Sequence, residues 1–581
     1  MEYKYLSEIN PVDGLVHKEN IFNIQKKLDK ERRINKEVDI DSPGGENTPW
    51  IERGPDNVGE RTRAIIFDPN DPTKETVFAG GVSGGLWKNT NISDSNSKWE
   101  RIGIPENLAV SCIAVDPNNS KIFYVGTGES YVDGDVNGNG VWKSTDGGST
   151  WTHIFGGSTG KSFLDTGTSL VVNSPTFIAG RYTAVIATFG GELNDAITGD
   201  LVLVDDGEAP TNDACENILN AENINGKIAI IKRGSCNSDD KVVKAQNSGA
   251  IAVIMVNNIS GDPIAMGGDD SSITIPALMI SLEDGNSLIS SLGSTVNITI
   301  EKSEGIGVRL VPGVHHINDI VVRNINGQSE VYVAAGESGY FSSSNVAIIG
   351  GDSFGLYKST DGSNFTQINL PSTSNGNKYE PNNIEIAANN SIYLSTINSR
   401  TYQDGGGCIF HSFDGNNFAL KHKVSGGLRT EISLSSFNEN IGYILVQTSE
   451  DPVKIYKTTD GFSTVNSASL PNDADTDIPA NDFTRGQAFY NLIIKVDPNN
   501  DNIVYVGGID LFKSLDGGNS WSQLTHWYGG FNFQEVHADQ HGIAFASSQK
   551  LLFSNDGGVY YSSNSGANIQ ARNNNFNVSS T

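Results

Sequence analysis

A short phrase that returns along the chain constrains its fold more than any other feature. At Val141–Trp151 an apolar strand end runs into the motif Ser-x-Asp-x-Gly, and Trp151 then opens a second strand. Adjacent copies lie roughly 45–55 residues apart, which is the size of one four-stranded propeller blade. Counting degenerate copies near Asn89 and at Ser562–Gly566 gives seven units. The clear copies are centred on Asp146, Asp361, Asp414, Asp460 and Asp516.

The residues around each motif have the same order of strands. A first apolar strand often ends in Asp-Pro-Asn, which is turn chemistry because Pro presets φ and Asn tolerates the left-handed region. A second strand, a Gly-rich turn and a third strand lead into the motif. Examples of the first strand are Ile65–Pro69, Ile113–Pro117 and Ile494–Pro498. We therefore expect an all-β protein built as a seven-bladed β-propeller with four-stranded blades.

The acidic residue of the motif has a structural explanation. Its carboxylate can accept backbone N–H bonds of its own turn, while the Gly takes the position with φ > 0. Such turns lie at the outer edge of a blade, away from the central axis, and need no substrate. We therefore assign a structural role to Asp146, Asp361, Asp414, Asp460 and Asp516.

One gap between copies, from Ser144 to Ser359, is too long for a blade and indicates an inserted α+β domain. Three of the four methionines fall inside it, and a helix fits Asp239–Ser248. We expect an N-terminal, partly helical arm at 1–48, blades at 49–166, the insertion at 167–304 and further blades at 305–581. The strands expected in the insertion are Tyr182–Thr188, Leu201–Val204, Lys227–Ile231, Ile251–Val256 and Val296–Ile300.

The ring of blades needs a closing strand, because open first and last blades would expose their edges. The last unit ends weakly at Ala567–Gln570, whereas Trp50–Gly54 looks like the fourth strand at Trp99–Gly103. We expect Trp50–Gly54 to complete the seventh blade. The alternative is a piece of a larger propeller, which the Asn-rich end at Asn573–Asn577 leaves open.

The repeated motif resembles the Asp-box (BNR-like) repeats of sialidases, xyloglucanase-type glycosidases and sortilin-like propellers. The likeness is closest to secreted sortilin-like proteins of Bacteroidetes-type bacteria. The phrases that carry it are Gly54–Arg63, Gly84–Lys88 and His537–His541. This resemblance implies a propeller and is not specific for an activity.

The insertion resembles a protease-associated (PA) domain. The residues that carry this resemblance are Ala214, Cys215, Gly226–Cys236, Lys241, Lys244–Gln246, Gly249–Ile254 and Ile275–Ala277. The resemblance implies a disulfide between Cys215 and Cys236 and an oxidising, exported setting. It also implies a domain that binds or gates substrates and is not itself catalytic.

Function in a propeller usually lies at the axial mouth, where the inner strands begin. Aligning the first strands brings Arg, His, Glu, Tyr and Asp side chains to one axis. Such a mouth could bind a sugar, a peptide terminus or a cation, and the alternative is a polar channel that only holds water. The candidate ligand-binding residues are Arg61, His316, Glu380, Tyr490, Asp539 and His541.

Three classes of function follow from these features. The favoured one is an exported recognition module for a glycan or protein ligand, because no complete catalytic constellation is present. The alternative is a glycoside hydrolase, which requires two opposed carboxylates, and here Asp539 and Glu380 are the available pair. A third is a substrate-binding accessory of a peptidase, since the chain contains neither His-Glu-x-x-His nor a nucleophile elbow of its own.

A metal site is conceivable in one Gly-rich loop. Asp133, Asp135 and Asn137 resemble the start of a calcium loop, although Ser144 stands where an EF-hand places Glu. A hydrated turn is the alternative to Ca²⁺ there. The acidic run of Asp473, Asp475 and Asp477 is interpreted as a solvated loop. No cofactor is required by the favoured function.

Charge and hydropathy limit the partners. The formal net charge of −28 argues against nucleic acid or an anionic membrane, since both need a basic face. No apolar run is long enough for a transmembrane segment. The first residues lack the apolar core of a signal peptide, so either the protein is cytosolic or the numbering starts after a removed signal. We expect a monomer that is secreted or on the cell surface.

Overall fold

The computed structural model describes residues 58–576, apart from 106, 133–135, 342–345 and 451, together with the helical residues Ile24, Lys27, Lys30 and Glu31. The expected closing strand Trp50–Gly54 and nearly all of the expected arm 1–48 lie outside the described residues. The described chain divides into two compact units, here called the propeller unit and the PA unit. The PA unit includes residues 158–312, a wider span than the expected 167–304.

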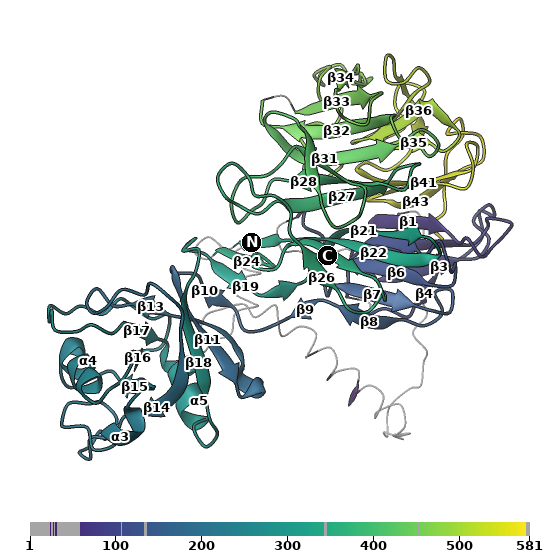
Figure 1. The fold of residues 1–581 in the computed structure, drawn as a ribbon. Coiled ribbons are helices and arrows are strands. Elements are labelled where there is room, and N and C mark those ends of the chain that lie inside the picture. The colour runs from purple at the N-terminus through teal and green to yellow at the C-terminus, as the bar shows by residue number, and fades with distance from the viewer. Residues whose placement is uncertain are drawn as a thin grey trace, which may run out of the picture. The chain divides into compact units, whose positions relative to one another are not determined.

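The propeller unit contains seven four-stranded antiparallel sheets of the same order (Figure 1). From the inner strand outward, the first two are β1 (Thr62–Phe67), β2 (Val77–Gly81), β3 (Leu86–Asn89) and β4 (Glu100–Ile102), then β5 (Val110–Val115), β6 (Phe123–Thr127), β7 (Val141–Ser144) and β8 (Thr152–Phe155). The third and fourth are β21 (His316–Ile325), β22 (Gln328–Gly336), β25 (Gly355–Ser359) and β26 (Thr366–Ile368), then β27 (Glu380–Ile386), β28 (Ile392–Ile397), β29 (Cys408–Ser412) and β30 (Ala419–Lys423).

The remaining three sheets continue the series along the chain. They are β31 (Gly427–Leu434), β32 (Gly442–Thr448), β33 (Val453–Thr458) and β34 (Asn466–Ser467); β35 (Ile493–Asp497), β36 (Asn500–Gly507), β37 (Leu511–Ser514) and β38 (Ser522–Gln523); and β41 (Gln540–Phe545), β42 (Leu551–Asn555), β43 (Gly558–Ser562) and β44 (Gln570–Ala571). The short strands β39 (Thr525–His526) and β40 (Gln534–Glu535) pair with each other between the last two sheets.

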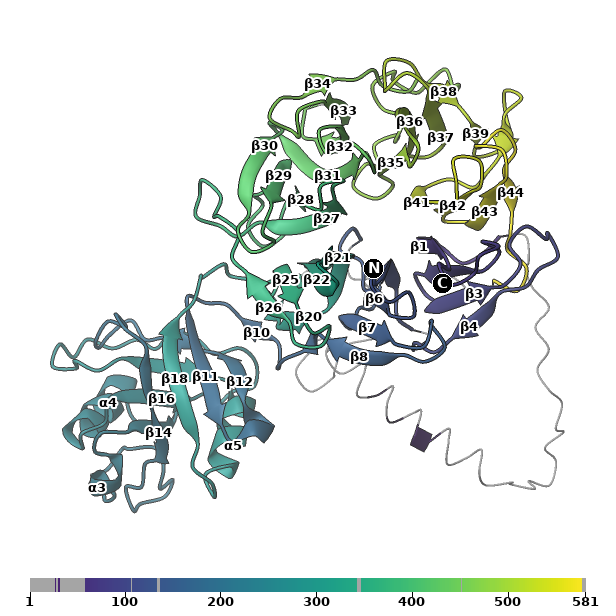
Figure 2. The same ribbon diagram turned by 45° about the vertical axis from the view of Figure 1, so that its right-hand side comes forward.

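These sheets form a ring around their inner strands. Each inner strand contacts the inner strand of the next sheet, and β1 contacts β41, so the first sheet lies against the last. Figure 2 shows the inner strands turned toward the centre of the ring. The all-β class and the propeller architecture expected from the repeat are therefore confirmed.

The antiparallel order of each sheet separates two faces of the ring. The turns from first to second strand and from third to fourth strand lie at one end of the blades, which we call the box face because it contains the Ser-x-Asp-x-Gly turns. The second-to-third turns and the connections between sheets lie at the other end, which we call the connection face. The PA unit interrupts one of these connections, between β8 and β21.

The C-terminal segment Arg572–Phe576 joins the last sheet to the first. The Trp99 indole donates to the carbonyl of Arg572 at 2.5 Å, and the Trp99 amide donates to the carbonyl of Asn574 at 3.0 Å. The Phe576 ring stacks on Trp99 with centroids 4.8 Å apart. Since β44 already holds the fourth position of the last sheet, that sheet is complete without Trp50–Gly54. The Asn-rich end, which in the sequence allowed a larger propeller as an alternative, therefore supplies the contacts that connect the last sheet to the first.

The PA unit is built on an eight-stranded mixed sheet with the order β12-β11-β18-β14-β15-β16-β17-β13. Successive residues of β15 alternate between two buried clusters, one on each face, because side chains of a strand point to opposite sides. A helix was expected at 239–248, and α4 lies there. The elements are β11 (Thr168–Ser174), β12 (Gly180–Thr183), β13 (Val185–Ile186), β14 (Ile197–Leu203), α3 (Ala221–Ile224), β15 (Ile228–Lys232), α4 (Ser238–Asn247), β16 (Ala252–Val256), β17 (Ala277–Ile280), α5 (Leu282–Ser290) and β18 (Asn297–Lys302).

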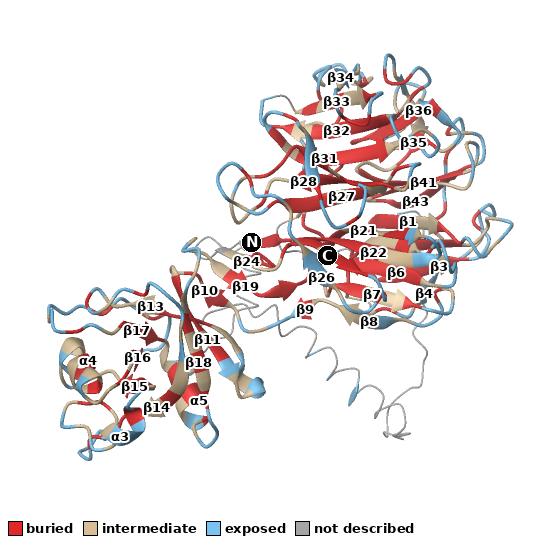
Figure 3. Cartoon of the chain, in the orientation of Figure 1, coloured by how far each residue is buried: buried red, intermediate tan, exposed pale blue. Residues whose placement is uncertain are grey.

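Burial follows the strands rather than the loops (Figure 3). The second strands β2 and β6 are buried along their whole length, and the cores of the blades form where neighbouring sheets meet. Exposed residues gather in the turns and outer strands. Among the described helices, none has both the length and the apolar character that crossing a membrane requires.

Candidate functional site

The inner strands bring the predicted mouth residues to the connection face. Arg61, His316, Glu380 and Asp539 lie at or directly before the start of β1, β21, β27 and β41. Tyr490 precedes β35 by three positions and His541 lies within β41. Their interactions divide them into two groups: Arg61, Tyr490, Asp539 and His541 join one network, whereas His316 and Glu380 belong to other surroundings.

Arg63 is the centre of the larger network. This buried guanidinium pairs with Glu129 through Nη2 and Oε1 at 2.5 Å, and donates from Nη1 to the Tyr490 carbonyl at 2.9 Å. Burial alone would raise the pKa of Glu129, but the charges of Arg63 and Arg61 outweigh burial and hold this pKa below its usual value. Glu129 is 1% exposed and lies in the β6–β7 connection, four residues before the calcium-like motif and not part of it.

His541 is held in one neutral form by this network. Burial, reinforced by the neighbouring charge of Arg63, lowers the pKa of His541 well below its usual value. Arg63 Nη1 lies 2.8 Å from Nδ1, and since a guanidinium only donates, Nδ1 accepts. The proton therefore resides on Nε2, which donates to Asp556 Oδ1 at 2.6 Å.

Tyr131 fills the space between two arginines on the axis. Its ring centroid lies 5.2 Å from the guanidinium carbon of Arg63 and 3.8 Å from that of Arg429. The Tyr131 hydroxyl donates to Asn382 Oδ1 at 2.9 Å, and Arg429 pairs with Glu431 at 2.8 Å. Residues from four sheets thus meet around Tyr131, and the charges of Arg63 and Arg429 are paired with those of Glu129 and Glu431.

Two carboxylates remain at the mouth above this layer. Asp556 Oδ1 and Oδ2 each accept from the Tyr490 hydroxyl at 2.8 Å, and Asp539 Oδ1 accepts from Asn491 Nδ2 at 2.6 Å. Burial raises the pKa of both Asp539 and Asp556, and the charge of Asp556 adds to the rise at Asp539. Asp539 has φ of +66°, the left-handed region that a non-glycine residue adopts at some cost.

The mouth also carries groups suited to a polar ligand. Arg61 is one-quarter exposed at its side chain and donates to the Tyr490 hydroxyl at 3.0 Å. Phe489, next to Tyr490, is 48% exposed. Carboxylate acceptors, a guanidinium donor and an exposed ring are the polar and aromatic elements found in binding sites for small polar molecules.

Glu380 does not share these surroundings. It is 2% exposed, and its Oε1 accepts the backbone N–H of Glu337 at 3.0 Å. Burial, followed by the charge of Glu337, raises the pKa of Glu380 well above its usual value. Glu380 and Asp539 have no interaction partner in common among the described residues. The predicted carboxylate pair therefore remains a prediction, and Asp556 is the carboxylate whose charge acts on Asp539.

His316 is buried apart from the mouth network. It is 1% exposed, and neither ring nitrogen has a hydrogen-bond partner among the described residues. Burial lowers the pKa of His316 to about 3, so the ring is neutral. A neutral, enclosed imidazole is suited to packing.

Sequence reasoning missed Glu129, Tyr131, Arg429 and Asp556. Asp556 lies in the turn Asn555–Gly558, which the sequence marks only as a tight Gly-rich turn. The other three lie in strands or turns of ordinary composition. Their convergence depends on the ring, so no local signal could have revealed it.

A cavity of 410 Å³ lies at the opposite, box-face end of the inner strands. Its lining includes Lys495 and Glu385, whose Nζ and Oε1 atoms are 2.6 Å apart, and apolar residues such as Ile543. Lys74 is a third charged residue of this lining. The sequence did not point to this end.

The Ser-x-Asp-x-Gly turns are self-contained. Asp146 Oδ1 accepts from the Ser144 hydroxyl at 2.8 Å and from the Thr150 amide at 2.9 Å. The hydrogen bonds from Thr150 and Ser144 lower the pKa of Asp146. The turns at Asp361, Asp414, Asp460 and Asp516 repeat the Ser/Thr contact. These carboxylates have the turn-forming contacts expected of structural residues.

The expected calcium loop is only partly described. Asp133 and Asp135 lie outside the described residues. The Asn137 side chain donates to the Asn107 carbonyl at 3.3 Å, which is a structural contact. The Ca²⁺ site stays a prediction.

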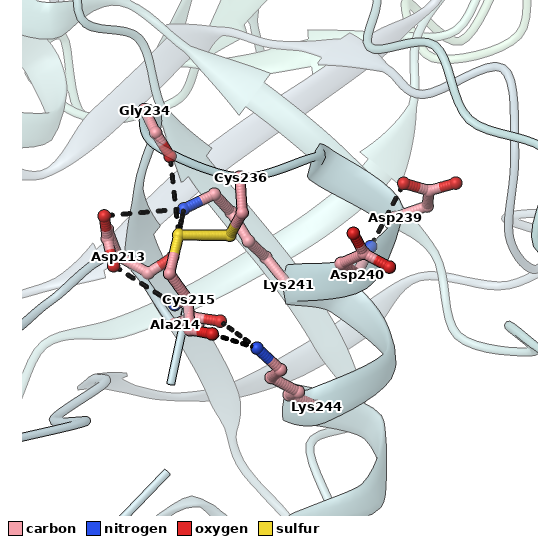
Figure 4. The surroundings of a disulfide bond; sticks show 9 residues. All are labelled: Asp213, Ala214, Cys215, Gly234, Cys236, Asp239, Asp240, Lys241 and Lys244. Atoms are coloured by element: carbon pink, nitrogen blue, oxygen red, sulfur yellow. Dashed lines mark hydrogen bonds and ion pairs between the residues drawn. A yellow bond between two sulfur atoms is a disulfide. The ribbon is translucent and has the colours of Figure 1, made fainter. Parts of the chain in front are cut away.

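In the PA unit a disulfide joins Cys215 and Cys236, as the resemblance implied. Figure 4 shows two lysines of α4 turned toward the loop before Cys215. The buried Lys241 ammonium donates to the Asp213 carbonyl and lies 3.2 Å from Cys215 Sγ, while Lys244 donates to the carbonyls of Ala214 and Cys215. Burial lowers the pKa of Lys241. These contacts position the disulfide loop on the helix.

Comparison with known proteins separates the two units. Over 89 residues the chain is 35% identical to the minor extracellular protease Vpr of Bacillus subtilis (strain 168), a match that covers 14% of this chain and 11% of that protein. It is 29% identical over 103 residues to the xyloglucanase Xgh74A of Acetivibrio thermocellus, which covers 16% of this chain and 11% of that protein. The chain thus spans about a tenth of the length of these curated relatives.

A solved structure with wider coverage is YCF48 from Cyanidioschyzon merolae, with a TM-score of 0.38 and 10% identity over 87% of this chain and 96% of that chain. One family model matches within the chain, over residues 197–288, and its description is the PA domain. This match covers four of the eight strands of the sheet, β14 to β17, and both cysteines of the disulfide. Residues 197–288 therefore belong to the PA domain family.

Proposed function

We propose that this protein is an exported recognition module that binds a glycan or protein ligand at the connection-face mouth of its Asp-box, sortilin-like propeller. The observation that carries this proposal is the contrast between Asp539 and Asp556 at the mouth and the charge-paired layer of Arg63, Tyr131 and Arg429 below them. The carboxylates can accept hydrogen bonds from ligand hydroxyl or amino groups.

Export and a surface or secreted location are part of the same proposal. A disulfide persists in oxidising compartments, and Cys215–Cys236 is formed in the PA unit. A relative that matches part of the chain is named an extracellular protease. The PA domain then offers a second protein- or peptide-binding element on the same chain.

A glycoside hydrolase is the second candidate, because Asp539 has a neighbouring carboxylate and a partial relative is named a xyloglucanase. In this version Asp556, rather than Glu380, is the partner of Asp539. Both carboxyl groups have raised pKa values, which suits a general acid but leaves the second role, base or nucleophile, less supported. A peptidase accessory, the third class, would use the PA unit instead of the mouth.

The test is a glycan array and a polysaccharide turnover assay on the wild type, Asp539→Asn and Asp556→Asn. Glu100→Gln is the matched control, because Glu100 is an exposed carboxylate on the outer strand β4. We expect wild type and Glu100→Gln to bind the same glycans without releasing reducing ends, and both Asn variants to bind at least about tenfold more weakly. If the wild type releases reducing ends and both Asn variants do not, the protein is a glycoside hydrolase and the recognition-module proposal is wrong.

If both Asn variants still bind the ligand, the connection-face mouth is not the ligand-binding site. Peptide binding retained by an isolated PA unit would then favour the peptidase accessory. Circular dichroism and thermal melting of each variant separate loss of binding from loss of fold.

A further inference from the structure

A second group of charged residues lies on the connection face, away from the axis. It is formed by the loop between β34 and β35, the β36–β37 turn and the loop that contains β39. Its members are Asp473, Asp475, Arg485, Asp510 and His526. The expectation of a solvated loop at Asp473–Asp477 is therefore wrong for Asp473, which is 6% exposed.

Arg485 satisfies two of the three carboxylates. Its Nη2 lies 2.9 Å from Asp473 Oδ2 and 2.7 Å from Asp475 Oδ2. Asp475 also accepts from the Tyr528 hydroxyl at 2.8 Å, and Asp473 Oδ1 accepts from the Asp475 amide at 2.9 Å. These contacts hold the loop in place and orient Asp473.

Asp510 is left without such contacts. It is fully buried, no side chain hydrogen-bonds to either carboxylate oxygen among the described residues, the backbone N–H of Trp527 lies beside it, and Arg485 Nη2 is 3.8 Å away. A buried carboxylate in this state is costly unless a proton or a cation neutralises it.

His526 faces the same point. It is fully buried, and neither ring nitrogen has a hydrogen-bond partner in the described part of the chain, although Nε2 lies 3.3 Å from Asp475 Oδ2. Tyr528 and Phe531 pack on its ring with centroids at 4.1 and 5.3 Å. Unlike His316, His526 has carboxylates beside its ring, so an unpartnered ring nitrogen is available to share a cation with them.

The distances permit a single ion. One ligand atom from each of Asp473, Asp510 and His526 lies within 4.8 Å of the other two. This is the largest separation that two ligands of one cation reach at bond lengths of about 2.0–2.4 Å. With all three carboxylates ionised, the group with Arg485 carries two negative charges in excess, which a divalent cation neutralises.

The second grouping of this kind in the described chain shows a different solution. Asp206, Asp213 and Glu216 of the PA unit also have ligand atoms within 4.8 Å. There Lys241 Nζ lies 3.9 Å from Asp213 Oδ2 and supplies a positive charge from the protein itself. No lysine forms an ion pair with the Asp510 group among the described residues, and Arg485 is engaged by Asp473 and Asp475.

We propose that Asp473, Asp510 and His526 bind one divalent transition-metal cation such as Zn²⁺ or Mn²⁺. An imidazole with two carboxylates suits these ions, whereas Ca²⁺ prefers ligand sets made of oxygen alone. The ion joins the loop that carries Tyr490 and Asn491 to the loop that carries Asp539. It is therefore a structural link beside the mouth, and its presence does not depend on the proposed ligand.

The experiment uses the full chain after dialysis against a chelator. Calorimetric titration with ZnCl₂, MnCl₂ and CaCl₂ separately, with metal content measured by mass spectrometry, compares wild type with Asp510→Asn and His526→Gln. Asp477→Asn is the matched control, because Asp477 is exposed, lies in the same loop and changes the net charge equally. Thermal melting with and without metal accompanies each titration.

We expect one equivalent of Zn²⁺ or Mn²⁺ in the wild type and in Asp477→Asn, with binding at least about tenfold weaker in both site variants. We also expect the melting temperature of the wild type to rise with those metal ions that bind in the titration and to stay unchanged with those that do not. Asp510→Asn removes a buried charge, so in chelator it should melt no lower than the wild type.

Three results would overturn the proposal. They are no binding of either transition metal to the wild type, equal binding by Asp510→Asn and His526→Gln, or an equal loss in Asp477→Asn, which would mean an unspecific acidic surface. If one site variant fails to fold, the other decides the question.

Discussion

The carboxylates on the two faces of the propeller differ in their hydrogen-bond partners and in the direction of their pKa shifts. On the box face, Asp146 and its counterparts are satisfied within four residues of their own turn, and their pKa values are lowered by those hydrogen bonds. On the connection face, Asp539, Asp556 and Asp510 are drawn inward by contacts between distant segments, and burial raises their pKa values. The carboxylates of the repeated motif stabilise their turns. The carboxylates that occur once, on the connection face, are the ones that could bind a ligand or a cation.

This difference follows from where the hydrogen-bond partners lie. In a third-to-fourth-strand turn the backbone N–H groups point at one side chain of the same turn, so each copy is independent of the others. Asp510 and Asp556 lie in second-to-third turns and Asp539 in a connection between sheets, and their side chains meet groups of other segments only when the ring closes. Loops of this kind on a rigid scaffold commonly carry function.

The largest effect should come from the axis below the connection face. Arg63→Met leaves Glu129 buried without its partner, and removing one member of a buried ion pair costs about 3–5 kcal/mol. We expect the free energy of unfolding of the propeller unit to fall by this amount in urea titrations, with Lys421→Met, a change at an exposed residue of β30, close to wild type.

A double variant sharpens this point. Arg63→Met with Glu129→Gln removes both charges and should recover part of the loss. If the double variant is no more stable than Arg63→Met, the uncompensated charge of Glu129 is not the cause.

The next effect is a dependence of stability on pH. Glu60, beside β1 on the connection face, has one oxygen without a hydrogen-bond partner, and burial raises its pKa from 4.5 to about 7. Because the folded state holds the proton more tightly, the stability from Glu60 is fully present below pH 4.5. It is lost as pH rises toward 7, by up to about 3 kcal/mol.

Glu60→Gln should abolish this loss. Unfolding titrations at intervals between pH 4.5 and 7.5 measure the difference between the two proteins. The prediction fails if the two pH profiles stay parallel. The box-face carboxylates act in the opposite sense, since their lowered pKa values add stability that is lost only as pH falls below about 4.

The smallest effect should come from a single box. Asp146→Asn keeps the side-chain shape and removes the charge that accepts from Thr150, so we expect a fall in melting temperature of about 1–3 °C. Binding at the mouth should not change. A loss of ligand binding comparable to that of Asp539→Asn would show that the two faces are not independent.

Much of the fold could be predicted because its signals are local. The box at Ser144–Trp151 and the Asp-Pro turns form their hydrogen bonds within a few residues. Their spacing therefore predicts the strands, the blades and the start of each inner strand. The predicted starts of the inner strands are what pointed to Arg61, Tyr490, Asp539 and His541 as residues of one mouth. The same locality allowed α4 and the Cys215–Cys236 bridge to be anticipated from the PA-type residues.

The rest required contacts between segments far apart in the chain. Glu380 has the right position on β27, yet its environment comes from Glu337, which no spacing rule connects to it. Ring closure by Arg572–Phe576 depends on Trp99 at the other end of the propeller. An Asn-rich tail by itself suggests only irregular structure.

By itself, then, the sequence determined the repeating unit, the propeller class and the presence of a PA domain, because turn geometry and strand patterning depend on neighbours a few residues away. Only the tertiary structure decided which charged groups meet. Asp473, Asp510 and His526 come from three separate connections, and Asp556 reaches Tyr490 across two sheets. Burial of charge is set by long-range packing, so their pKa values and chemical roles exist only once the ring has closed.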